Sequence, residues 1–549
     1  MRTAARALVD QLVVHGVDAA FCVPGESYIA VLDALGDAPI RLVSTRHEAA
    51  AATMAEAYGK LTGRPGVCLV TRGPGATHAS VGLHTAYQDS TPLVLLVGQV
   101  PRPMLGREAF QELEYRPAFA GLVKWAGQIE DADRVPELVA RAFAVAVSGR
   151  PGPVLLAMPE DVLSEETGAP DADPYRLPRA APRREDLEGL RDLLAAAERP
   201  VAIVGEGGWS ADAARDALAF CEQNDLPVAT SFRCQDYVDN RSSVYCGPLT
   251  IGKDPKLAQR VRAADLVVAV GGRLGEITTS GYTLLEPPRP RQRLVHVHPS
   301  ADELGAVYQA DLPVLATLPE FCALARELAP VDAAGRRSWT EEARSDYLEN
   351  LEHDPLPSPV DVGEVMAVLR RQLPDDAVFT CGAGNFTVWA HRFYEFSRFG
   401  TQLAPRSGAM GYGVPAALAA KVLHPDRPVV CLAGDGDFLM SGQELATAGQ
   451  YRLDAVVIVV NNGMYGTIRM HQEREFPGRV VGTDLVNPDF VAYAEAFGCA
   501  GELVERTDEF EGALARALAA DGPALVELRV SQEAITPRAT LTEIREGRA

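Results

Sequence analysis

Short runs of β-branched and other apolar residues alternate with helical patterns along the chain. The runs typical of buried strands are PIRLVST, GVCLVT and PLVLLVG, then RPVAIVG, LVVAVGG and LVHVH, and finally AVFTCG, PVVCLAG, AVVIVVNN and ALVELRV. Between them lie segments with helical patterns, such as EAAAATMAEAYGKLTG and GQELATAGQYR. Strands that alternate with helices predict βαβ units, and therefore the α/β class with mostly parallel sheets flanked by helices.

Two proline-rich stretches divide this pattern into three parts. Prolines recur at every fourth position in TGAPDADPYRLPRAAPRRED, and three more fall within EHDPLPSPVD. Because proline supports neither a helix interior nor a central strand, both stretches are predicted to be linkers. We therefore expect three α/β domains, residues 1–165, 185–335 and 360–549, within the three or four domains that 549 residues suggest.

Composition and charge exclude several classes of protein. The chain is 47% hydrophobic and 23% charged, a globular balance unlike that of disordered, collagen-like or coiled-coil proteins. Its formal net charge of -22 repels nucleic acid and anionic lipid, so neither nucleic acid nor a membrane is an expected partner. Nine cysteines are scattered without a C-x-x-C pair, so no disulfide framework or zinc site is indicated. The first residues resemble no signal peptide, and a cytoplasmic protein is expected.

The densest chemical signal is a Gly-Asp-Gly sequence at 434–436, followed after 24 residues by Asn-Asn at 461–462. Each follows or ends a predicted strand. Because parallel strands end at the same edge of a sheet, Asp435 and Asn462 are expected to converge. With the backbone carbonyl of Met464 they would offer Mg²⁺ three hard oxygen ligands, and the glycines would let the backbone approach a diphosphate. The alternative, an ordinary glycine-rich loop, leaves the paired asparagines unexplained.

This signature resembles that of thiamine diphosphate-dependent enzymes, in which GDG is followed by a spacer in the middle twenties and by NN. The likeness covers nearly the whole chain. The three expected domains resemble the family's pyrimidine-binding, central Rossmann-like and diphosphate-binding domains, in that order. GRPGVCLVTRGPGAT, REAFQE, and MGYGVPAA with GQELATA are most similar to the acetolactate synthase branch.

The resemblance implies how the cofactor is activated. Thiamine diphosphate reacts through its thiazolium C2 carbanion, whose proton is removed by the 4′-imino group of its own aminopyrimidine. A carboxylate at pyrimidine N1′ favours that tautomer, and Glu48, which follows RLVST at a helix start, is similar to the activating glutamate. Alternatively, Glu48 is a solvated residue of the first helical turn. Met410 in SGAMGYGVP matches the side chain that bends the cofactor into a V, although methionine is more commonly a core residue.

Other positions follow from the same resemblance. Phe110 and Gln111 match residues that line the reacting centre, with the Gln111 amide as a donor to an oxyanion. His78 and His84 are expected near the same mouth, either as proton relays or as core histidines. Lys124 is interpreted as a solvated lysine in preference to a partner of the substrate carboxylate. Further cofactor contacts are expected from Pro24, Gly25 and Glu26 on the pyrimidine side, and from Gly384, Asn385, Phe386, Gly434, Gly436, Asp437, Tyr465 and Gly466 on the diphosphate side.

Three departures from the branch bear on function. His471 stands where acetolactate synthases carry a tryptophan that favours a larger acceptor keto acid, so a different acceptor preference is expected. The central segment GGRLGEITTSGY keeps Arg273 of the branch's flavin-binding pattern but loses the second arginine, which argues against FAD. The tandem His-His pair used by some keto-acid decarboxylases is absent from the whole sequence.

The resemblance implies an enzyme that binds thiamine diphosphate and Mg²⁺ where the first domain of one subunit meets the third domain of another, in a homodimer or homotetramer. It would decarboxylate a 2-keto acid and ligate the resulting enamine to a second carbonyl, as an acetolactate synthase-like transferase or lyase. A 2-keto acid decarboxylase, an acyloin lyase and a non-catalytic thiamine diphosphate-binding subunit are the alternatives. A flavin or nicotinamide oxidoreductase built on the central domain would leave the GDG and NN loops unexplained.

Overall fold

The computed structural model describes residues 1–548, which form two units and three six-stranded parallel sheets. The first unit comprises Met1–Pro178, Pro405–Asp426 and Ser441–Asp454. The strand order of its sheet is β3 (Arg41–Ser44), β2 (Ala19–Cys22), β4 (Gly66–Val70), β5 (Leu93–Gln99), β7 (Pro153–Pro159) and β6 (Trp125–Gln128). A short antiparallel pair, β1 (Arg2–Thr3) and β8 (Glu166–Thr167), lies apart from it.

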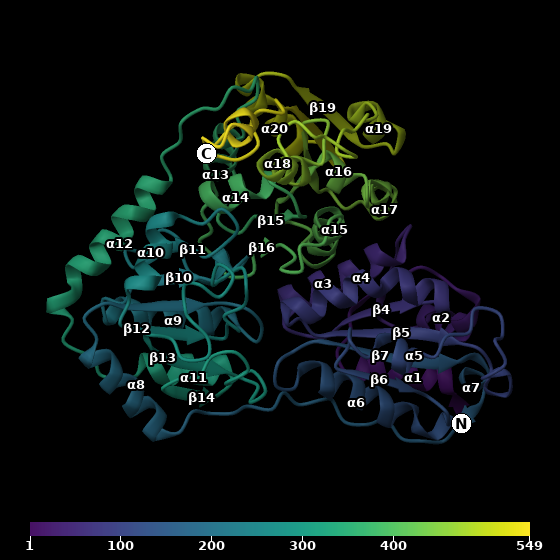
Figure 1. The fold of residues 1–549 in the computed structure, drawn as a ribbon. Helices are drawn as coiled ribbons and strands as arrows, with labels where there is room; N and C mark the ends of the chain where they lie inside the picture. Colours follow the sequence, from purple (N-terminus) through teal and green to yellow (C-terminus); the bar gives the residue numbers. More distant parts are fainter. Residues whose placement is uncertain (549) are drawn as a thin grey trace. The chain divides into compact units, whose positions relative to one another are not determined.

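Helices cover both faces of this first sheet (Figure 1). On one face α1 (Ala4–Val14) and α6 (Val135–Val147) share a hydrophobic core with the strands. On the other face lie α3 (Glu48–Thr62) and α4 (Gly73–Asp89), with α15 (Gly413–Leu423) packed on α3. The remaining helices of the unit are α2 (Ile29–Gly36), α5 (Tyr115–Phe119), α7 (Glu160–Leu163) and α17 (Leu445–Tyr451).

The second unit comprises Arg179–Ala404, Arg427–Met440 and Ala455–Ala549 and contains two sheets. Its first sheet has the order β11 (Tyr245–Pro248), β10 (Val228–Thr230), β9 (Pro200–Val204), β12 (Leu266–Val270), β13 (Arg293–His298) and β14 (Leu312–Leu315). Helices α8 (Arg184–Ala196), α9 (Ala211–Gln223) and α11 (Leu318–Arg326) pack into one core with it, and α10 (Pro255–Ala263) packs into another. Helix α12 (Arg337–Asn350) follows this sheet in the chain.

The other sheet of the second unit has the order β16 (Gln402–Leu403), β15 (Val378–Cys381), β17 (Val429–Gly434), β18 (Val456–Asn461), β20 (Ala524–Arg529) and β19 (Ala500–Val504). Its core includes side chains of α13 (Val362–Gln372), α14 (Phe386–Phe393) and α20 (Phe510–Leu518). The remaining helices are α16 (Asp435–Phe438), α18 (Gly466–Glu475), α19 (Phe490–Ala496) and α21 (Leu541–Arg545).

The expected α/β class with three parallel-sheet domains is confirmed. Each of the ten apolar runs interpreted as strands contains one, and residues 168–183 and 351–361 in the two proline-rich stretches form neither helix nor strand. The nine cysteines lie within the described residues and are buried as free thiols. Among residues 1–548, no helix combines the length and the hydropathy needed to span a bilayer.

Candidate active site

Three loops at the carboxyl ends of neighbouring parallel strands meet in the third sheet. They are residues 382–386 after β15, 434–437 after β17 and 462–466 after β18. The N–H of Ala383 donates to Oδ1 of Asp437 (3.2 Å), and the N–H of Gly463 donates to Oδ2 of Asp435 (2.8 Å). The middle loop is therefore hydrogen bonded to both of its neighbours, as the strand order predicts.

Asp435 lies at the centre of this junction, at the start of α16, and is 3% exposed. Its carboxylate accepts hydrogen bonds from the N–H groups of Gly436 (2.9 Å) and Gly463 (2.8 Å). Nδ2 of Asn487 donates a third (2.8 Å). Burial raises the pKa of Asp435, and the donors oppose this rise because they stabilise the anion. A buried carboxylate is costly unless positive charge also faces it, so this one is suited to a cation.

The paired asparagines form the opposite side of the junction. Oδ1 of Asn461 accepts from the N–H of Gly463 (3.2 Å) and from Nδ2 of Asn487 (2.9 Å). Oδ1 of Asn462 accepts from the N–H of Met464 (3.2 Å). Asn487 thus joins the buried carboxylate to the asparagine turn through one amide nitrogen. Its own Oδ1 is buried and has no hydrogen-bond partner within the described chain.

Aromatic rings explain why three positions of these loops are glycines. A Cβ on Gly436 would lie 2.5 Å from the ring of Tyr465. A Cβ on Gly434 or Gly384 would lie 2.8 or 2.7 Å from the ring of Phe386. Since carbon atoms do not approach so closely, a side chain at any of these positions would displace a ring. The two rings therefore set the spacing of the three loops.

Asn385 ties the first loop to the third. Its N–H donates to the hydroxyl of Thr467 (2.9 Å), and that hydroxyl donates to Oδ1 of Asn385 (2.9 Å). Its Nδ2 donates to the carbonyl of Ile535 (3.0 Å). Gly466, the first residue of α18, is close to Asn462, because a Cβ there would lie 3.2 Å from Nδ2 of that side chain. The N-terminus of α18 consequently lies at the junction, where its N–H groups favour an anion such as phosphate.

In the first unit, Glu48 begins α3 and contacts a histidine of the neighbouring helix. The side chain of His47 caps α3 by accepting the N–H of Ala49 at Nδ1 (3.1 Å). Oε2 of Glu48 lies 2.9 Å from Nδ1 of His78, on α4, and the rings of His47 and His78 are stacked 4.7 Å apart. A Cβ on Gly75 would lie 3.5 Å from Oε1 of Glu48, so the start of α4 closes over the carboxylate.

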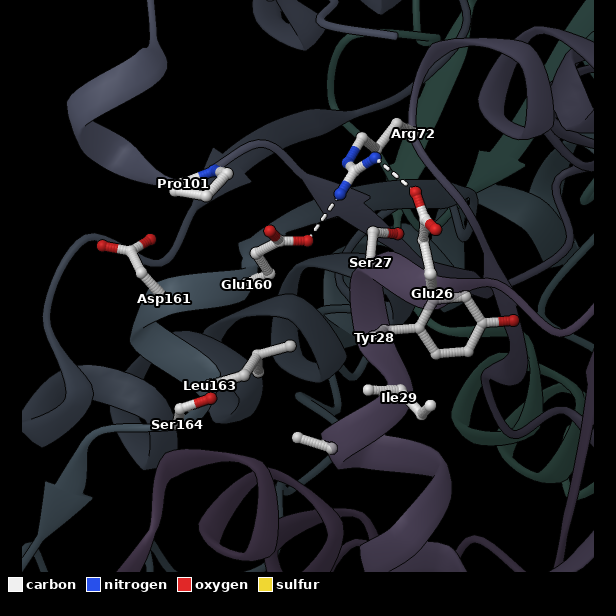
Figure 2. A pocket seen from close by; sticks show the side chains of 11 residues that line it. Glu26, Ser27, Tyr28, Ile29, Arg72, Pro101, Glu160, Asp161, Leu163 and Ser164 are labelled. Atoms are coloured by element: carbon white, nitrogen blue, oxygen red, sulfur yellow. Dashed lines mark hydrogen bonds and ion pairs between the residues drawn. The ribbon is translucent and has the colours of Figure 1, made fainter. Parts of the chain in front are cut away.

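The loop VPGES packs against the end of β4 and borders a cleft of about 610 Å³ (Figure 2). A Cβ on Gly25 would lie 2.6 Å from Cβ of Thr71, which leaves room only for glycine. The guanidinium of Arg72 bridges the carboxylates of Glu26 (3.0 Å) and Glu160 (2.5 Å). Glu26 is therefore engaged with an arginine, and this bridge fastens the Pro24–Glu26 loop to the start of α4.

The loop that carries Phe110 and Gln111 is held by its backbone. The N–H of Gly73 donates to the carbonyl of Gln111 (3.0 Å), and Gln111 has a positive φ of 64°. The carboxylate of Glu112 accepts the N–H groups of Gly106 (2.6 Å) and Ala109 (2.9 Å). Phe110 is 75% exposed at the tip. The start of α4 thus positions this loop as well as the histidine that faces Glu48.

Three further predicted positions have fewer contacts. Met410 is half-buried in the loop before α15, and that loop is anchored where the Tyr412 hydroxyl donates to Oε2 of Glu56 (2.6 Å). His84 is exposed on α4, nearly two turns beyond the histidine that contacts Glu48. His471, in the second unit, is exposed on α18.

The interpretation of Lys124 as a solvated lysine is wrong. Its Nζ donates to the carbonyls of Val145 (2.5 Å) and Ser148 (2.6 Å) at the C-terminal end of α6. Burial lowers the pKa of Lys124 to about 8. Lys124 therefore caps a helix whose last carbonyls need donors.

Comparison with known proteins agrees with this geometry. Family models described as the N-terminal TPP binding domain, the central domain and the C-terminal TPP binding domain of thiamine pyrophosphate enzymes match residues 2–117, 187–324 and 382–528. The acetolactate synthase large subunit of Parasynechococcus marenigrum (strain WH8102) is 34% identical over 547 residues, which cover 96% of this chain and 87% of that protein. The chain belongs to the thiamine pyrophosphate enzyme family. It is also 30% identical to the acetolactate synthase isozyme 2 large subunit of Escherichia coli (strain K12), over 96% of this chain and 95% of that subunit.

A thiamine pyrophosphate enzyme of the acetolactate synthase-like branch needs a metal site and a diphosphate cradle, and the residues present fit both. Asp435, Asn462 and the carbonyl of Met464 are hard oxygen donors at one edge of a sheet, the donor set that Mg²⁺ prefers. The buried Oδ1 of Asn487, which has no hydrogen-bond partner in the described part of the chain, adds an acceptor for a water bound to such an ion. The N-terminus of α18 supplies N–H groups for the diphosphate.

In the central domain, the arginine that the flavin-binding pattern of the branch shares with this chain is already paired with a carboxylate. The crevice lies between the ends of β9 and β12, where the strand order reverses. There Arg273 donates to Oε2 of Glu206 (2.7 Å), and Glu206 is 5% exposed with a positive φ of 67°. A Cβ on Gly271 would lie 2.6 Å from the carbonyl of Gly205 and 2.7 Å from Nε1 of Trp209. The two loops therefore approach each other closely, and the guanidinium of Arg273 is paired with a buried carboxylate.

Sequence reasoning missed Asn487 and Thr467, which hold the asparagine turn and the first loop in place. Asn487 lies 25 residues beyond the asparagine pair in VNPD, and no strand-end or spacing signal marks it. Thr467 follows Gly466 directly, and a threonine at the start of a helix is usually a cap. Arg72 was missed because an arginine after a strand is usually solvated, whereas this one is 6% exposed between two carboxylates.

Proposed function

We propose that this protein is a thiamine diphosphate- and Mg²⁺-dependent carboligase. It would decarboxylate a 2-keto acid and join the former keto carbon, now nucleophilic, to a second carbonyl compound. The observation that carries the proposal is the hydrogen-bonded junction of Asp435 with the asparagine turn at 461–464. Its donor set matches the metal and diphosphate requirements of the family to which the chain belongs. Similarity to acetolactate synthase large subunits supports pyruvate or a related 2-keto acid as donor.

Each set of residues has a defined task in this proposal. Bound thiamine diphosphate supplies a nucleophilic carbon and a sink for the electrons released with CO₂. Asp435, Asn462 and the Met464 carbonyl would hold Mg²⁺, and the N-terminus of α18 would bind oxygens of the diphosphate. Glu48 holds a proton at N1′ of the pyrimidine, which requires a carboxylate shielded from bulk water. Its side chain is 13% exposed.

The remaining predicted residues are proposed to shape the reacting centre. Gln111 donates its side-chain amide to an oxyanion and Phe110 excludes water from it. Met410 supports the cofactor's bent shape, and His471 lies on the acceptor side. Because Arg273 at the central crevice is already paired with Glu206, we propose that no flavin takes part. A homodimer or homotetramer is proposed, as membership of the thiamine pyrophosphate enzyme family implies.

Product identification tests the reaction. The purified protein, thiamine diphosphate and Mg²⁺ would be incubated with a panel of 2-keto acids, with and without added aldehydes, and products identified by mass spectrometry. We expect CO₂ and a 2-hydroxyketone or acetohydroxy acid. Release of a free aldehyde alone would identify a decarboxylase instead, and cleavage of an acyloin without CO₂ would identify a lyase.

Calorimetry tests the cofactor site separately. The variant Asp435→Ala should lose Mg²⁺-dependent binding of thiamine diphosphate, because the metal joins protein oxygens to phosphate oxygens. Asp508→Ala is the matched control, since it removes an exposed carboxylate of the same unit that is paired with Arg506. Undiminished metal-dependent binding by Asp435→Ala would show that the GDG loop is not the metal site.

A further inference from the structure

Glu48 and His78 form a pair in which a shielded carboxylate contacts a more exposed imidazole. The Glu48 side chain is 13% exposed, whereas that of His78 is 53% exposed. They come from neighbouring helices, α3 and α4, whose close packing depends on Gly82, where a Cβ would lie 2.4 Å from Cβ of Ala52. The packing of the two helices therefore sets the backbone positions from which the two side chains meet.

The hydrogen bonds determine which nitrogen of each histidine carries a proton. An ionised carboxylate only accepts, so the Nδ1 of His78 that lies 2.9 Å from Glu48 Oε2 must carry hydrogen. His47 is the reverse, because its Nδ1 accepts the N–H of Ala49 and its proton is therefore on Nε2. Neutral His78 consequently presents the lone pair of Nε2 away from Glu48, at the more exposed end of its ring.

The same cluster resembles a metal site, but the tautomers disfavour one. The ligand atoms of His47, Glu48 and His78 all lie within 4.8 Å of one another. A metal bound to His47 at Nε2 would displace the proton that the helix cap fixes there, and a metal at Nδ1 would break the cap. Proton transfer requires no such change.

We propose that His78 is the proton shuttle of Glu48, an inference that rests on the proposed function. When Glu48 takes up a proton, His78 gives it the Nδ1 proton and its Nε2 takes one from a hydronium ion or a buffer acid, so that one proton passes from solution to Glu48. In the opposite direction, Nδ1 receives the proton from Glu48 and Nε2 releases one to water. No oxidant or further reactant is needed, and the imidazole is neutral before and after each transfer. His47, stacked on His78, keeps the ring in the plane that both transfers need.

Two variants of His78 separate shuttling from simple positioning. His78→Asn keeps an amide N–H that can donate to Glu48 but has no second nitrogen to take a proton from water. We expect it to bind thiamine diphosphate with wild-type affinity and to slow C2 proton exchange on the order of 10-fold, since positioned acid–base groups contribute at least that much. His78→Ala should show the same loss, and added imidazole should restore exchange because the free base can occupy the vacated, exposed position. A residue that only positions Glu48 would give no rescue.

Val81→Asn is the matched control, because it places the same new residue at an exposed position of the same helix. Exchange in His78→Asn equal to that in Val81→Asn, with the wild type exchanging normally, would overturn the shuttle. A wild type that neither binds the cofactor nor exchanges its C2 proton would instead refute the proposed function.

A measurement on the cofactor-free protein tests the pair itself. With ¹⁵N-labelled histidine, the His78 signals, assigned by their loss in His78→Asn, should show a protonated Nδ1, and Glu48→Ala should shift them toward the ordinary Nε2–H tautomer. Unchanged signals in Glu48→Ala would contradict the hydrogen bond. Stoichiometric binding of Zn²⁺ by the cofactor-free protein, lost in His78→Asn, would reassign the cluster as a metal site.

Discussion

Glu48 and Asp435 are both carboxylates at the first position of a helix, yet their surroundings suit them to different ligands. Asp435 is almost fully buried, and backbone and amide N–H groups surround it. The N–H groups stabilise the anion in part, and positive charge would stabilise it further, which favours a metal ligand. Glu48 faces an ionisable imidazole. A carboxylate that shares a proton with a neighbour is suited to acid–base work, so environment alone separates the two roles.

The variant Glu48→Gln tests the proton role. Glutamine keeps the size of the side chain but cannot hold a proton at N1′, so cofactor binding should persist while C2 proton exchange slows on the order of 10²-fold or more. Exchange is measured by deuterium incorporation into the bound cofactor, and binding by calorimetry. Wild-type exchange in this variant would remove Glu48 from the activation step.

Acceptor choice is tested at His471, which is exposed on α18 one turn beyond Ile468, itself 54% exposed. An imidazole is smaller and more polar than an indole, so it offers less apolar surface to an alkyl side chain. We expect little preference for 2-ketobutyrate over pyruvate, and a higher preference in His471→Trp, because an added apolar contact is worth about 1–3 kcal/mol of discrimination. Competition between the two keto acids measures both. Strong preference in the wild type, or none gained in the variant, would remove His471 from the acceptor pocket.

At the scale of elements, the sequence could predict the loops at the strand ends. It could not predict the contacts that hold those loops in place. PVVCLAG and AVVIVVNN identify β17 and β18, and the parallel order then places Asp435 beside Asn462. The strand β2, AAFC, has no β-branched residue, and PVLLAMP of β7 has one, so neither gives a strand signal although both are buried. The prediction for Lys124 was wrong because its ammonium group binds carbonyls at the end of α6, a tertiary contact that the local sequence does not reveal.

The loops after β9 and β12 give a prediction about flavin. Glu206→Gly would remove the carboxylate from Arg273 and would suit the positive φ at this position, which glycine adopts without strain. We expect the wild type to lack flavin absorbance near 450 nm and to bind FAD at least about tenfold more weakly than Glu206→Gly, since each 1.4 kcal/mol changes affinity tenfold. Glu206→Asp keeps the charge and should behave like the wild type. A wild type purified with stoichiometric FAD would contradict the proposal that the pairing of Arg273 with Glu206 excludes flavin.

The junction of α1 with the first linker should weaken in acid. His15 stacks on Phe143 (4.6 Å between ring centroids) and accepts the N–H of Tyr175 at Nδ1 (3.2 Å). Burial lowers the pKa of His15 to about 4, so the unfolded chain takes up a proton first as the pH falls. Its contribution to stability is therefore complete above pH 6.5 and is lost as the pH falls toward 4.

Between pH 7 and pH 5 this linkage should lower the free energy of unfolding on the order of 1 kcal/mol, after allowance for solvent screening. The free energy of unfolding of His15→Gln should fall by correspondingly less over the same pH interval. That of His84→Gln, changed at an exposed site, should fall by as much as that of the wild type. Urea titrations at the two pH values measure the difference. Equal losses in all three proteins would show that His15 is not the group responsible.

For the whole molecule, the proposed residues divide between the two compact units. Glu48, His78, Gln111 and Met410 belong to the first unit, and the metal and diphosphate residues belong to the second. Both sets must act on one cofactor. We propose a homodimer in which the first domain of one subunit and the third domain of its partner complete each site, so that a single folded chain would be inactive.

Mixing two inactive variants tests this arrangement. A heterodimer of Glu48→Gln and Asp435→Ala has two sites if each site is shared between the subunits. One site then carries both substitutions, and the other carries neither. One intact site per heterodimer results, and random exchange should restore about a quarter of wild-type activity, because half of the dimers are mixed and each has one working site. If each site were built from one chain, every site in the mixture would carry a lesion. Activity that stays at the level of the separate variants, with subunit exchange shown by native mass spectrometry, would therefore place both sets of residues in one chain.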